Sequence, residues 1–193
     1  MPATWNNIED LIAGDGHLDI LALRSGASVE ALDALERHLG VALPQSVREF
    51  LAVHDGQERS ATGLFFHSMF LGTAEIAGQW DNWRSIDEVA MNEDCADFMT
   101  SEPKCVIKPM YTNRLWIPLT HDGGGNHAGL DFDPDTGGQP GQVIAFGRDL
   151  DTKRLVAPNF ETFIDLFAMH LRSGIWTLGE KGWHCPPGTR AWI

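Results

Sequence analysis

The sequence predicts an α+β fold: a single domain with an N-terminal helical hairpin packed on a mostly antiparallel sheet, followed by a C-terminal helix. Apolar residues recur at helical spacing near both ends of the chain, whereas the middle alternates short apolar runs with turns rich in glycine and aspartate. The order of helices, then strands, then a helix is typical of an α+β domain. The length of 193 residues is that of one domain with a sizeable core.

The hairpin is predicted from two neighbouring segments. In residues 28–39, valine and leucine fall on one face at spacings of three and four. Ser28 is a suitable N-cap, and Gly40 stands where a left-handed C-terminal residue is favoured. A second helix is predicted over residues 43–54, with proline in its first turn, and a weaker helix over residues 5–12 precedes both.

Four strands are predicted in the middle of the chain. Each is a short apolar or aromatic run bounded by turn residues, over residues 63–71, 114–119, 127–133 and 142–146. These runs predict a meandering sheet. Between the first two strands, residues 73–98 are polar and acidic with a helical leaning.

A helix over residues 159–171 closes the predicted fold, because apolar residues recur at helical spacing and Asn159 can cap its start. Residues 173–193 form a tryptophan-rich tail, which carries Trp176, Trp183 and Trp192. We expect this tail to pack back on the domain.

The charge of the chain bears on its partners. There are 27 acidic and 14 basic residues, which gives a net charge of −13, and residues 1–100 alone carry a net −12. Such a field repels a phosphate backbone, so direct nucleic-acid binding is disfavoured. It attracts a basic protein. The alternative is that the acidity serves solubility alone.

The sequence predicts a cytoplasmic protein. Its three cysteines are an odd and sparse set, which fits reduced thiols better than a disulfide framework. No stretch approaches 18 consecutive apolar residues, so no membrane span is expected. The first ten residues lack the basic region and apolar core of a secretory signal.

Motifs for catalysis or metal binding fail on their spacing. Residues 131–142 resemble a calcium loop, but the glycine falls one place late and Gln142 stands where a bidentate glutamate is needed. Residues 121–125 resemble the oxyanion loop of esterases, but no Gly-x-Ser-x-Gly elbow accompanies them. His121 and His127 match no structural zinc spacing and are expected to be solvated or hydrogen-bonded locally. The sequence therefore predicts no enzyme activity, no cofactor and no metal.

An acidic run offers a candidate surface for a partner. Residues 85–103 hold six acidic residues and no lysine or arginine. One interpretation is a solvated helix face. The other is a contact surface for a basic partner, with Trp80 and Trp83 as apolar anchors inside an acidic rim. The candidate acidic contacts are Asp87, Glu88, Glu93 and Asp94.

Three segments together resemble the SUKH superfamily. Residues 31–56 resemble its helical hairpin, in which a helix with a central glutamate runs into Leu-Gly, Leu-Pro and Phe-Leu and ends in a polar residue followed by glycine. Residues 116–133 resemble its core sheet through Trp-Ile-Pro, Asp-Gly-Gly-Gly-Asn and Leu-Asp-Phe-Asp, and residues 138–144 match the Gly-x-x-Gly-x-Val-Ile that follows. The resemblance covers residues 5–172 and implies a SUKH-like fold for that domain.

The resemblance implies two possible functions, because the family includes fungal regulators of cell-wall assembly and bacterial immunity proteins. A short chain without the disordered arms of the fungal regulators resembles the bacterial branch. This implies a non-enzymatic immunity protein that binds and neutralises a cognate toxin domain. The acidic charge favours a basic toxin domain, such as a nuclease. The alternative is a regulatory or scaffold binding module of the cell-wall-assembly-regulator type.

Four polar residues of the matched segments cluster at one strand-turn-strand end: Asp122, Asn126, Asp131 and Asp133. Their exposure there would make them partner contacts. Short polar side chains at such a turn also cap it by hydrogen bonding to the backbone, which is the alternative role.

Overall fold

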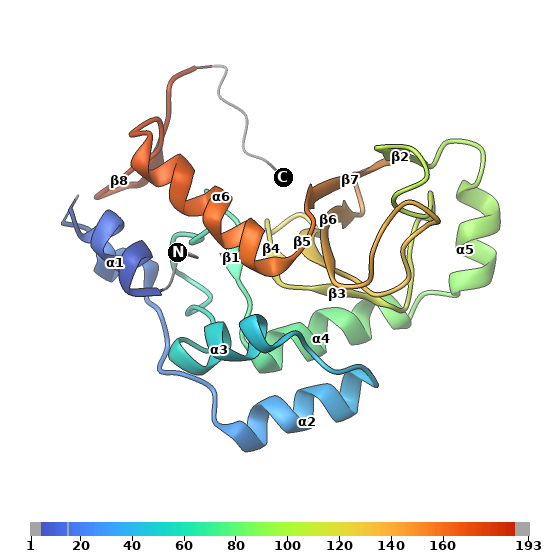
Figure 1. Ribbon diagram of the computed structural model, residues 1–193, viewed down its shortest axis with the longest axis horizontal. Helices are drawn as coiled ribbons and strands as arrows, with labels where there is room; N and C mark the ends of the chain where they lie inside the picture. Colours follow the sequence, from blue (N-terminus) through green and yellow to red (C-terminus); the bar gives the residue numbers. More distant parts are fainter. Residues whose placement is uncertain (1–4, 15, 188–193) are drawn as a thin grey trace.

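A mixed five-stranded sheet lies at the centre of the computed structural model, which describes residues 5–14 and 16–187 (Figure 1). The strand order is β2–β7–β6–β5–β3, and each pairing is antiparallel except that of β2 with β7. This architecture confirms the predicted fold class. The strands are β2 (Thr100–Glu102), β3 (Trp116–Pro118), β5 (Asn126–Asp131), β6 (Gln142–Gly147) and β7 (Thr152–Ala157).

Two strand pairs lie outside this sheet. The first joins β1 (Met69–Phe70) to β4 (Thr120–His121), and the second joins β8 (Thr177–Gly179) to β9 (Gly182–His184). Both pairs are antiparallel.

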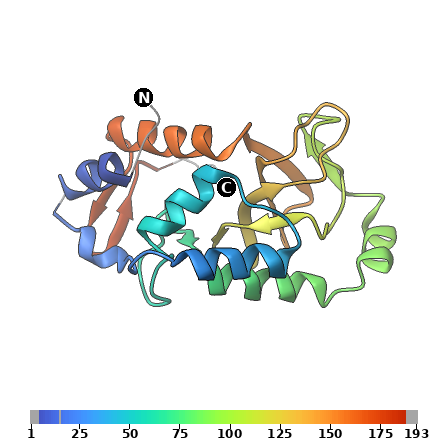
Figure 2. The ribbon, with the colours of Figure 1, turned by 60° about the horizontal axis from the view of Figure 1, so that its bottom comes forward.

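Helices pack around the sheet. Helices α2 and α4 lie side by side, α4 also contacts β3, and α1 packs on α6 (Figure 2). Within the described ranges, none of the helices is both long and apolar enough to cross a membrane. The helical elements are α1 (Trp5–Ala13), η1 (Leu18–Leu21), α2 (Val29–Leu39), α3 (Gln45–Val53), α4 (Thr73–Arg84), α5 (Glu88–Cys95) and α6 (Phe160–Arg172).

The predicted hairpin is formed by α2 and α3, and one glutamate fixes its corner. The Ser28 hydroxyl accepts a hydrogen bond from the Ala31 N–H at 3.2 Å, as expected of an N-cap. Glu36 accepts the Leu43 N–H at 2.7 Å through one carboxylate oxygen and pairs with Arg48 through the other. The central glutamate of the motif therefore holds the two helices at their angle.

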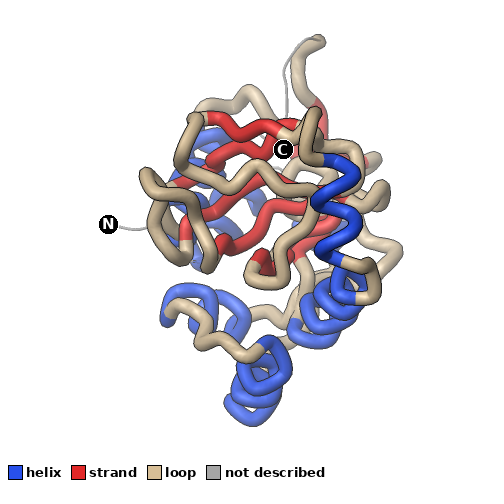
Figure 3. Tube along the Cα trace, turned by 90° about the vertical axis from the view of Figure 1, so that its right-hand side faces the viewer, coloured by secondary structure: helices blue, strands red, loops and turns tan. Residues whose placement is uncertain are grey.

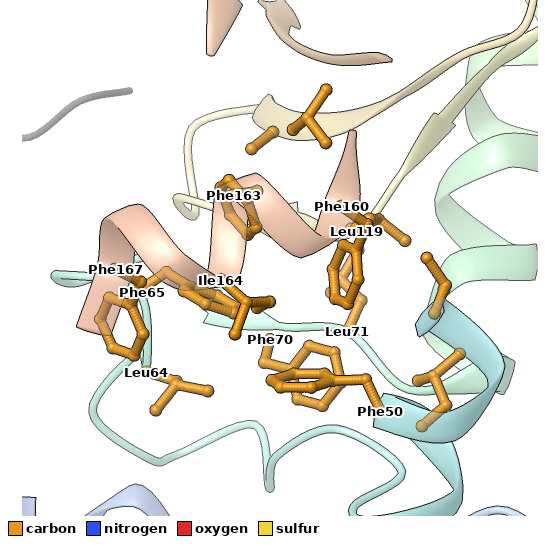
Figure 4. Close-up of a cluster of buried hydrophobic side chains, with 14 of the residues drawn as sticks. Phe50, Leu64, Phe65, Phe70, Leu71, Leu119, Phe160, Phe163, Ile164 and Phe167 are labelled. Carbon is orange, nitrogen blue, oxygen red and sulfur yellow. The ribbon is translucent and has the colours of Figure 1, made fainter. Parts of the chain in front are cut away.

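The main core lies between the sheet and the helices and is rich in phenylalanine (Figure 4). Phe50 of α3 meets Phe70 and Phe160 edge-on, with ring centroids 5.2 Å apart in each pair. The ring centroid of Phe65 lies 5.1 Å from that of Phe163 and 4.9 Å from that of Phe167, and both partners are on the buried stripe of α6. These rings join the N-terminal hairpin to the C-terminal helix.

The predicted strand over residues 63–71 is wrong for most of its length, because only Met69–Phe70 is a strand. Phe66 and His67 have φ angles of 48° and 80°, in the left-handed region that non-glycine residues rarely adopt. The Phe66 ring stacks on Trp176 at 4.5 Å and meets Trp183 edge-on. Packing of aromatic rings against distant residues therefore overrides the local strand preference.

The described part of the C-terminal tail shares this core, as expected. Trp176 and Trp183 are both buried, and the Trp183 indole N–H donates to the Gly63 carbonyl at 2.7 Å. Trp192 lies outside the described residues. The hairpin β8–β9 thus covers the tight turn around Phe66.

Candidate functional site

The predicted acidic contacts lie on and beside α5, at the right-hand edge of Figure 1 and facing the viewer in Figure 3. Glu93 and Asp94 are exposed. Asp87 caps the helix by accepting the Ala90 N–H at 3.1 Å, and Glu88 accepts the Arg114 N–H at 3.2 Å. Two of the four carboxylates therefore have a structural partner, and a role in partner binding stays a prediction for all four.

The two predicted tryptophan anchors have different environments. Trp80 is only 5% exposed, its indole N–H donates to the Arg114 carbonyl at 2.9 Å, and the Arg84 guanidinium lies over its ring at 4.4 Å. Trp80 is thus a core residue that offers little surface. Trp83 is half-buried and lines a hollow.

Asp122 and Asn126 cap the turn between β4 and β5, which is the second of the two roles considered. The Asp122 carboxylate accepts the backbone N–H groups of Gly124 at 2.7 Å and Asn126 at 2.9 Å. Partial burial raises the pKa of Asp122, but these hydrogen bonds outweigh burial and the pKa is lowered. Asn126 also accepts the Asp149 N–H, which ties the turn to the end of β6.

Asp131 is fully buried at the end of β5 and offers no surface in this structure. Its carboxylate accepts the Trp116 indole N–H at 3.1 Å and the Gln142 amide at 2.9 Å. Burial raises the pKa of Asp131, and the hydrogen bonds partly oppose that rise. Asp133 is half-buried and pairs with Lys108, which holds the preceding loop against the sheet.

A groove follows one face of α4. Its residues recur every three or four positions, beside the buried stripe of Thr73, Ile76 and Trp80. Two overlapping hollows of about 550 and 220 Å³ lie along this face and share Gln79 and Asn82, and a third of about 300 Å³ adjoins them at Ile86, beyond the C-terminal end of α4. We call this the α4 groove, and its floor along the chain is Glu75, Gly78, Gln79, Asn82, Trp83 and Ile86.

The N-terminus of α4 is fixed by a network from Arg24 and Asp55, which flank the helical hairpin. Asp55 accepts the Thr73 N–H at 2.6 Å, and Arg24 donates to the Asp55 carbonyl at 2.7 Å. Arg24 also forms a two-pronged ion pair with Glu75, which lowers the pKa of that carboxyl. Gly72 lets the two segments meet, since a Cβ there would lie 2.3 Å from the Asp55 carbonyl oxygen. The groove is therefore built on a rigid element.

The central hollow is lined by Trp83 and His127. The His127 ring donates from Nδ1 to the Thr120 carbonyl at 2.7 Å, because a carbonyl can only accept. Its Nε2 accepts the Trp83 indole N–H at 3.0 Å. Burial lowers the pKa of His127 to about 4, so the ring is neutral. Both nitrogens are engaged, so His127 orients Trp83 and has no free lone pair to act as a base.

Polar side chains without internal partners surround this hollow. Within residues 5–14 and 16–187, no hydrogen bond is found for the side-chain amides of Gln79 and Asn82 or for the Tyr111 hydroxyl. Arg148 completes the rim, with a side chain that is 74% exposed. These groups are available to hydrogen-bond a ligand above an aromatic floor.

Sequence reasoning missed most of this groove. The spacing of Gly78, Gln79 and Asn82 indicates a polar helix face, but not that the face is recessed. Tyr111 and Arg148 reach it from distant segments, which no local pattern shows. Among the described residues, no three His, Cys, Asp or Glu side chains are placed to hold a metal ion.

Comparison with known proteins gives one family and a consistent set of relatives. Residues 26–166 match the family model described as SMI1 / KNR4 family (SUKH-1). A glucan synthesis regulatory protein of Neurospora crassa is 33% identical over 92% of this chain and 40% of its own length. A cell wall biosynthesis/cell cycle regulator of Schizosaccharomyces pombe is 36% identical over 92% of this chain and 37% of its own length.

A cell wall assembly regulator of Saccharomyces cerevisiae is 29% identical over 74% of this chain and 35% of its own length. The chain thus spans well under half the length of these relatives. They correct the predicted function: the interpretation as an immunity protein that neutralises a bacterial toxin is wrong, because the relatives are named regulators of the cell wall and of glucan synthesis. The short chain length misled the prediction, since length does not distinguish the two branches.

Proposed function

Because the chain belongs to the SMI1 / KNR4 family (SUKH-1), we propose that it is a regulatory binding domain of the cell-wall-assembly-regulator type. It acts by contacting a partner protein at the α4 groove, without catalysing a reaction. The names of its relatives support regulation, and the S. pombe and N. crassa proteins align with it over nearly the whole chain.

The observation that carries the proposal is the construction of the α4 groove. Its floor is fixed by the Arg24–Glu75 ion pair and by the hydrogen bond between Trp83 and His127, and the Gln79 amide in that floor is unpaired within the described residues. A rigid aromatic floor with unpaired polar groups around it is typical of a binding site. The one histidine in its central hollow is neutral and engaged at both nitrogens, which favours binding over acid–base chemistry.

A cytosolic setting and a second contact are part of the proposal. The free cysteines, of which Cys105 and Cys185 are exposed, are compatible with a reducing compartment. The exposed carboxylates of α5, among them Glu93 and Asp94, would attract a basic surface of the partner at long range.

The proposal is tested by exchanging segments in S. pombe. The matched segment of the cell wall biosynthesis/cell cycle regulator is replaced by this chain, and cell-wall glucan is measured. Gly78→Phe is the diagnostic variant, because a Cβ at Gly78 meets nothing within 4 Å and the ring would fill the groove. Replacing glycine inside a helix also favours the helix, so the fold is kept. Ala34→Phe, on the exposed face of α2, is the matched control.

We expect wild type and Ala34→Phe to restore glucan to the level of the unaltered strain and Gly78→Phe to fail at equal protein abundance. Equal glucan with Gly78→Phe would contradict a role for the groove. Failure of the wild-type segment itself would contradict the regulatory assignment.

A further inference from the structure

We propose that the α4 groove binds an acidic, extended peptide segment of a partner protein. This inference rests on the proposed function, because it names the ligand of the same groove. It reverses the expectation that the overall charge suggests, since a chain of net charge −13 would repel acidic peptides elsewhere on its surface.

The charged side chains along the groove carry the argument. Cationic groups line all three hollows, although basic residues are half as common as acidic ones in the chain, with 14 against 27. The two carboxylates in the lining are already engaged, Glu75 with Arg24 and Glu88 with the Arg114 N–H. The cations are Arg59 in the first hollow, Arg148 in the central one, and Arg84 and Arg114 in the hollow beyond the C-terminal end of α4, where Arg84 also lies over the Trp80 ring.

The arginines of the first and central hollows, Arg59 and Arg148, have free donors. Among the described residues, Arg59 is exposed and has no carboxylate within ion-pair distance. Arg148 Nε lies 3.9 Å from Asp149 Oδ1, and the other oxygen of that carboxylate accepts the Asn126 amide. A guanidinium with free N–H groups binds a carboxylate through two parallel hydrogen bonds. The first and central hollows therefore each favour a glutamate or aspartate side chain.

The floor between these arginines fits an extended backbone. The amides of Gln79 and Asn82 lie one helical turn apart on the same face and can each donate to and accept from a peptide unit. Trp83, Ile86 and Tyr111 offer apolar surface for one side chain of the peptide. From Glu75 to Trp83, α4 rises by about 12 Å, which is the span of about four residues of an extended chain. The groove thus fits a short segment in which acidic residues flank an apolar one.

The test selects ligands without assuming a sequence. A displayed library of random ten-residue peptides is panned on the whole chain at low ionic strength, and the selected peptides are sequenced. The diagnostic variant is Arg59→Glu/Arg148→Glu, which removes two side chains that hold no close ion pair. The control is Arg37→Glu/Arg172→Glu, which changes the net charge equally at arginines of α2 and α6 that do not line the groove.

We expect peptides selected on the wild type to be enriched in Asp and Glu and depleted of Lys and Arg. Their affinity, measured by fluorescence anisotropy on resynthesised peptides, should fall at least about tenfold in the diagnostic variant and change little in the control. The loss should shrink as salt is added. No charge preference, or equal losses in both variants, would overturn the inference.

Two further measurements keep the alternatives apart: peptide binding to Gly78→Phe and sedimentation velocity. If the selected peptides show no charge preference but are lost with Gly78→Phe, the groove is a binding site and the acidic ligand is wrong. If Gly78→Phe leaves binding intact, both the inference and the proposed function fail. Sedimentation velocity tests whether the wild type is a dimer. A dimer that Arg59→Glu/Arg148→Glu converts to a monomer would mean that the groove binds a second copy of this chain, and it would overturn the inference.

Discussion

Protonation of His127 should lower the free energy of unfolding of the protein, and the size of the effect follows from the burial of the ring. The ring is 0% exposed and is neutral because burial lowers its pKa from 6.5 to about 4. In the unfolded chain the ring takes up a proton near pH 6.5, whereas in the folded chain it is protonated only near pH 4. Stability from this group is therefore complete above pH 6.5 and is lost as the pH falls toward 4.

The difference between the two pKa values corresponds to about 3 kcal/mol, because one pKa unit is worth about 1.4 kcal/mol. The comparison uses His127→Gln, whose amide can donate to the Thr120 carbonyl and accept the Trp83 N–H but does not titrate. Urea unfolding followed by tryptophan fluorescence gives the free energy of unfolding of both proteins from pH 7 to pH 4.5. Subtracting one curve from the other removes the carboxylates that titrate in the same range.

We expect the wild type to lose about 2 kcal/mol or more relative to His127→Gln over that range. His184→Gln, at an exposed position, should follow the wild type and serves as the control. Parallel curves for wild type and His127→Gln would refute the reasoning. So would an NMR titration in which the His127 ring changes its charge near pH 6.5.

For three other sites or pairs of sites, the structure determines whether a change raises or lowers the free energy of unfolding. Gly78→Ala should raise the free energy of unfolding by about 1 kcal/mol, because alanine favours the helix and its Cβ meets open space. Gly72→Ala should lower the free energy of unfolding by more than that, because its Cβ would clash with the Asp55 carbonyl oxygen. Thermal melting compares the two variants. Glu36→Ala should cost about 2–3 kcal/mol in urea unfolding, since it leaves the Leu43 N–H without its acceptor and breaks the ion pair with Arg48. Burial lowers the pKa of Lys153 to about 8, so wild-type stability should rise by up to about 3 kcal/mol from pH 8 to pH 10.5, while Lys153→Met should show no such rise.

Local patterns predicted the helices well. The expected helices over residues 28–39 and 159–171 are α2 and α6 within one residue at each end. Ser28 and Asn159 make the capping bonds expected of them, because a cap depends on residues only three places away. Features that depend on residues a few places apart can therefore be predicted from the sequence.

Features that depend on distant contacts could not be predicted. The aromatic run at residues 64–70 has the composition of a strand, but its rings pack against α6 and β8–β9 and force a tight turn. The expected surface residues Trp80 and Asp131 are buried because their polar atoms find partners on other strands and loops. The α4 groove likewise needs Tyr111 and Arg148, which lie far from α4 in the sequence.

The two buried tryptophans near the chain ends have a practical consequence for the longer relatives. The family match covers residues 26–166, so it omits Trp5, which donates to the Phe50 carbonyl at 2.8 Å, and Trp183, and it stops inside α6. Losing a buried tryptophan from a core costs several kcal/mol, at about 3–5 kcal/mol for each such side chain. A fragment of a relative cut at the limits of the family match, which are narrower than the alignments over 92% of this chain, would thus be expected to express poorly and aggregate. Its boundaries belong at the outermost buried indoles.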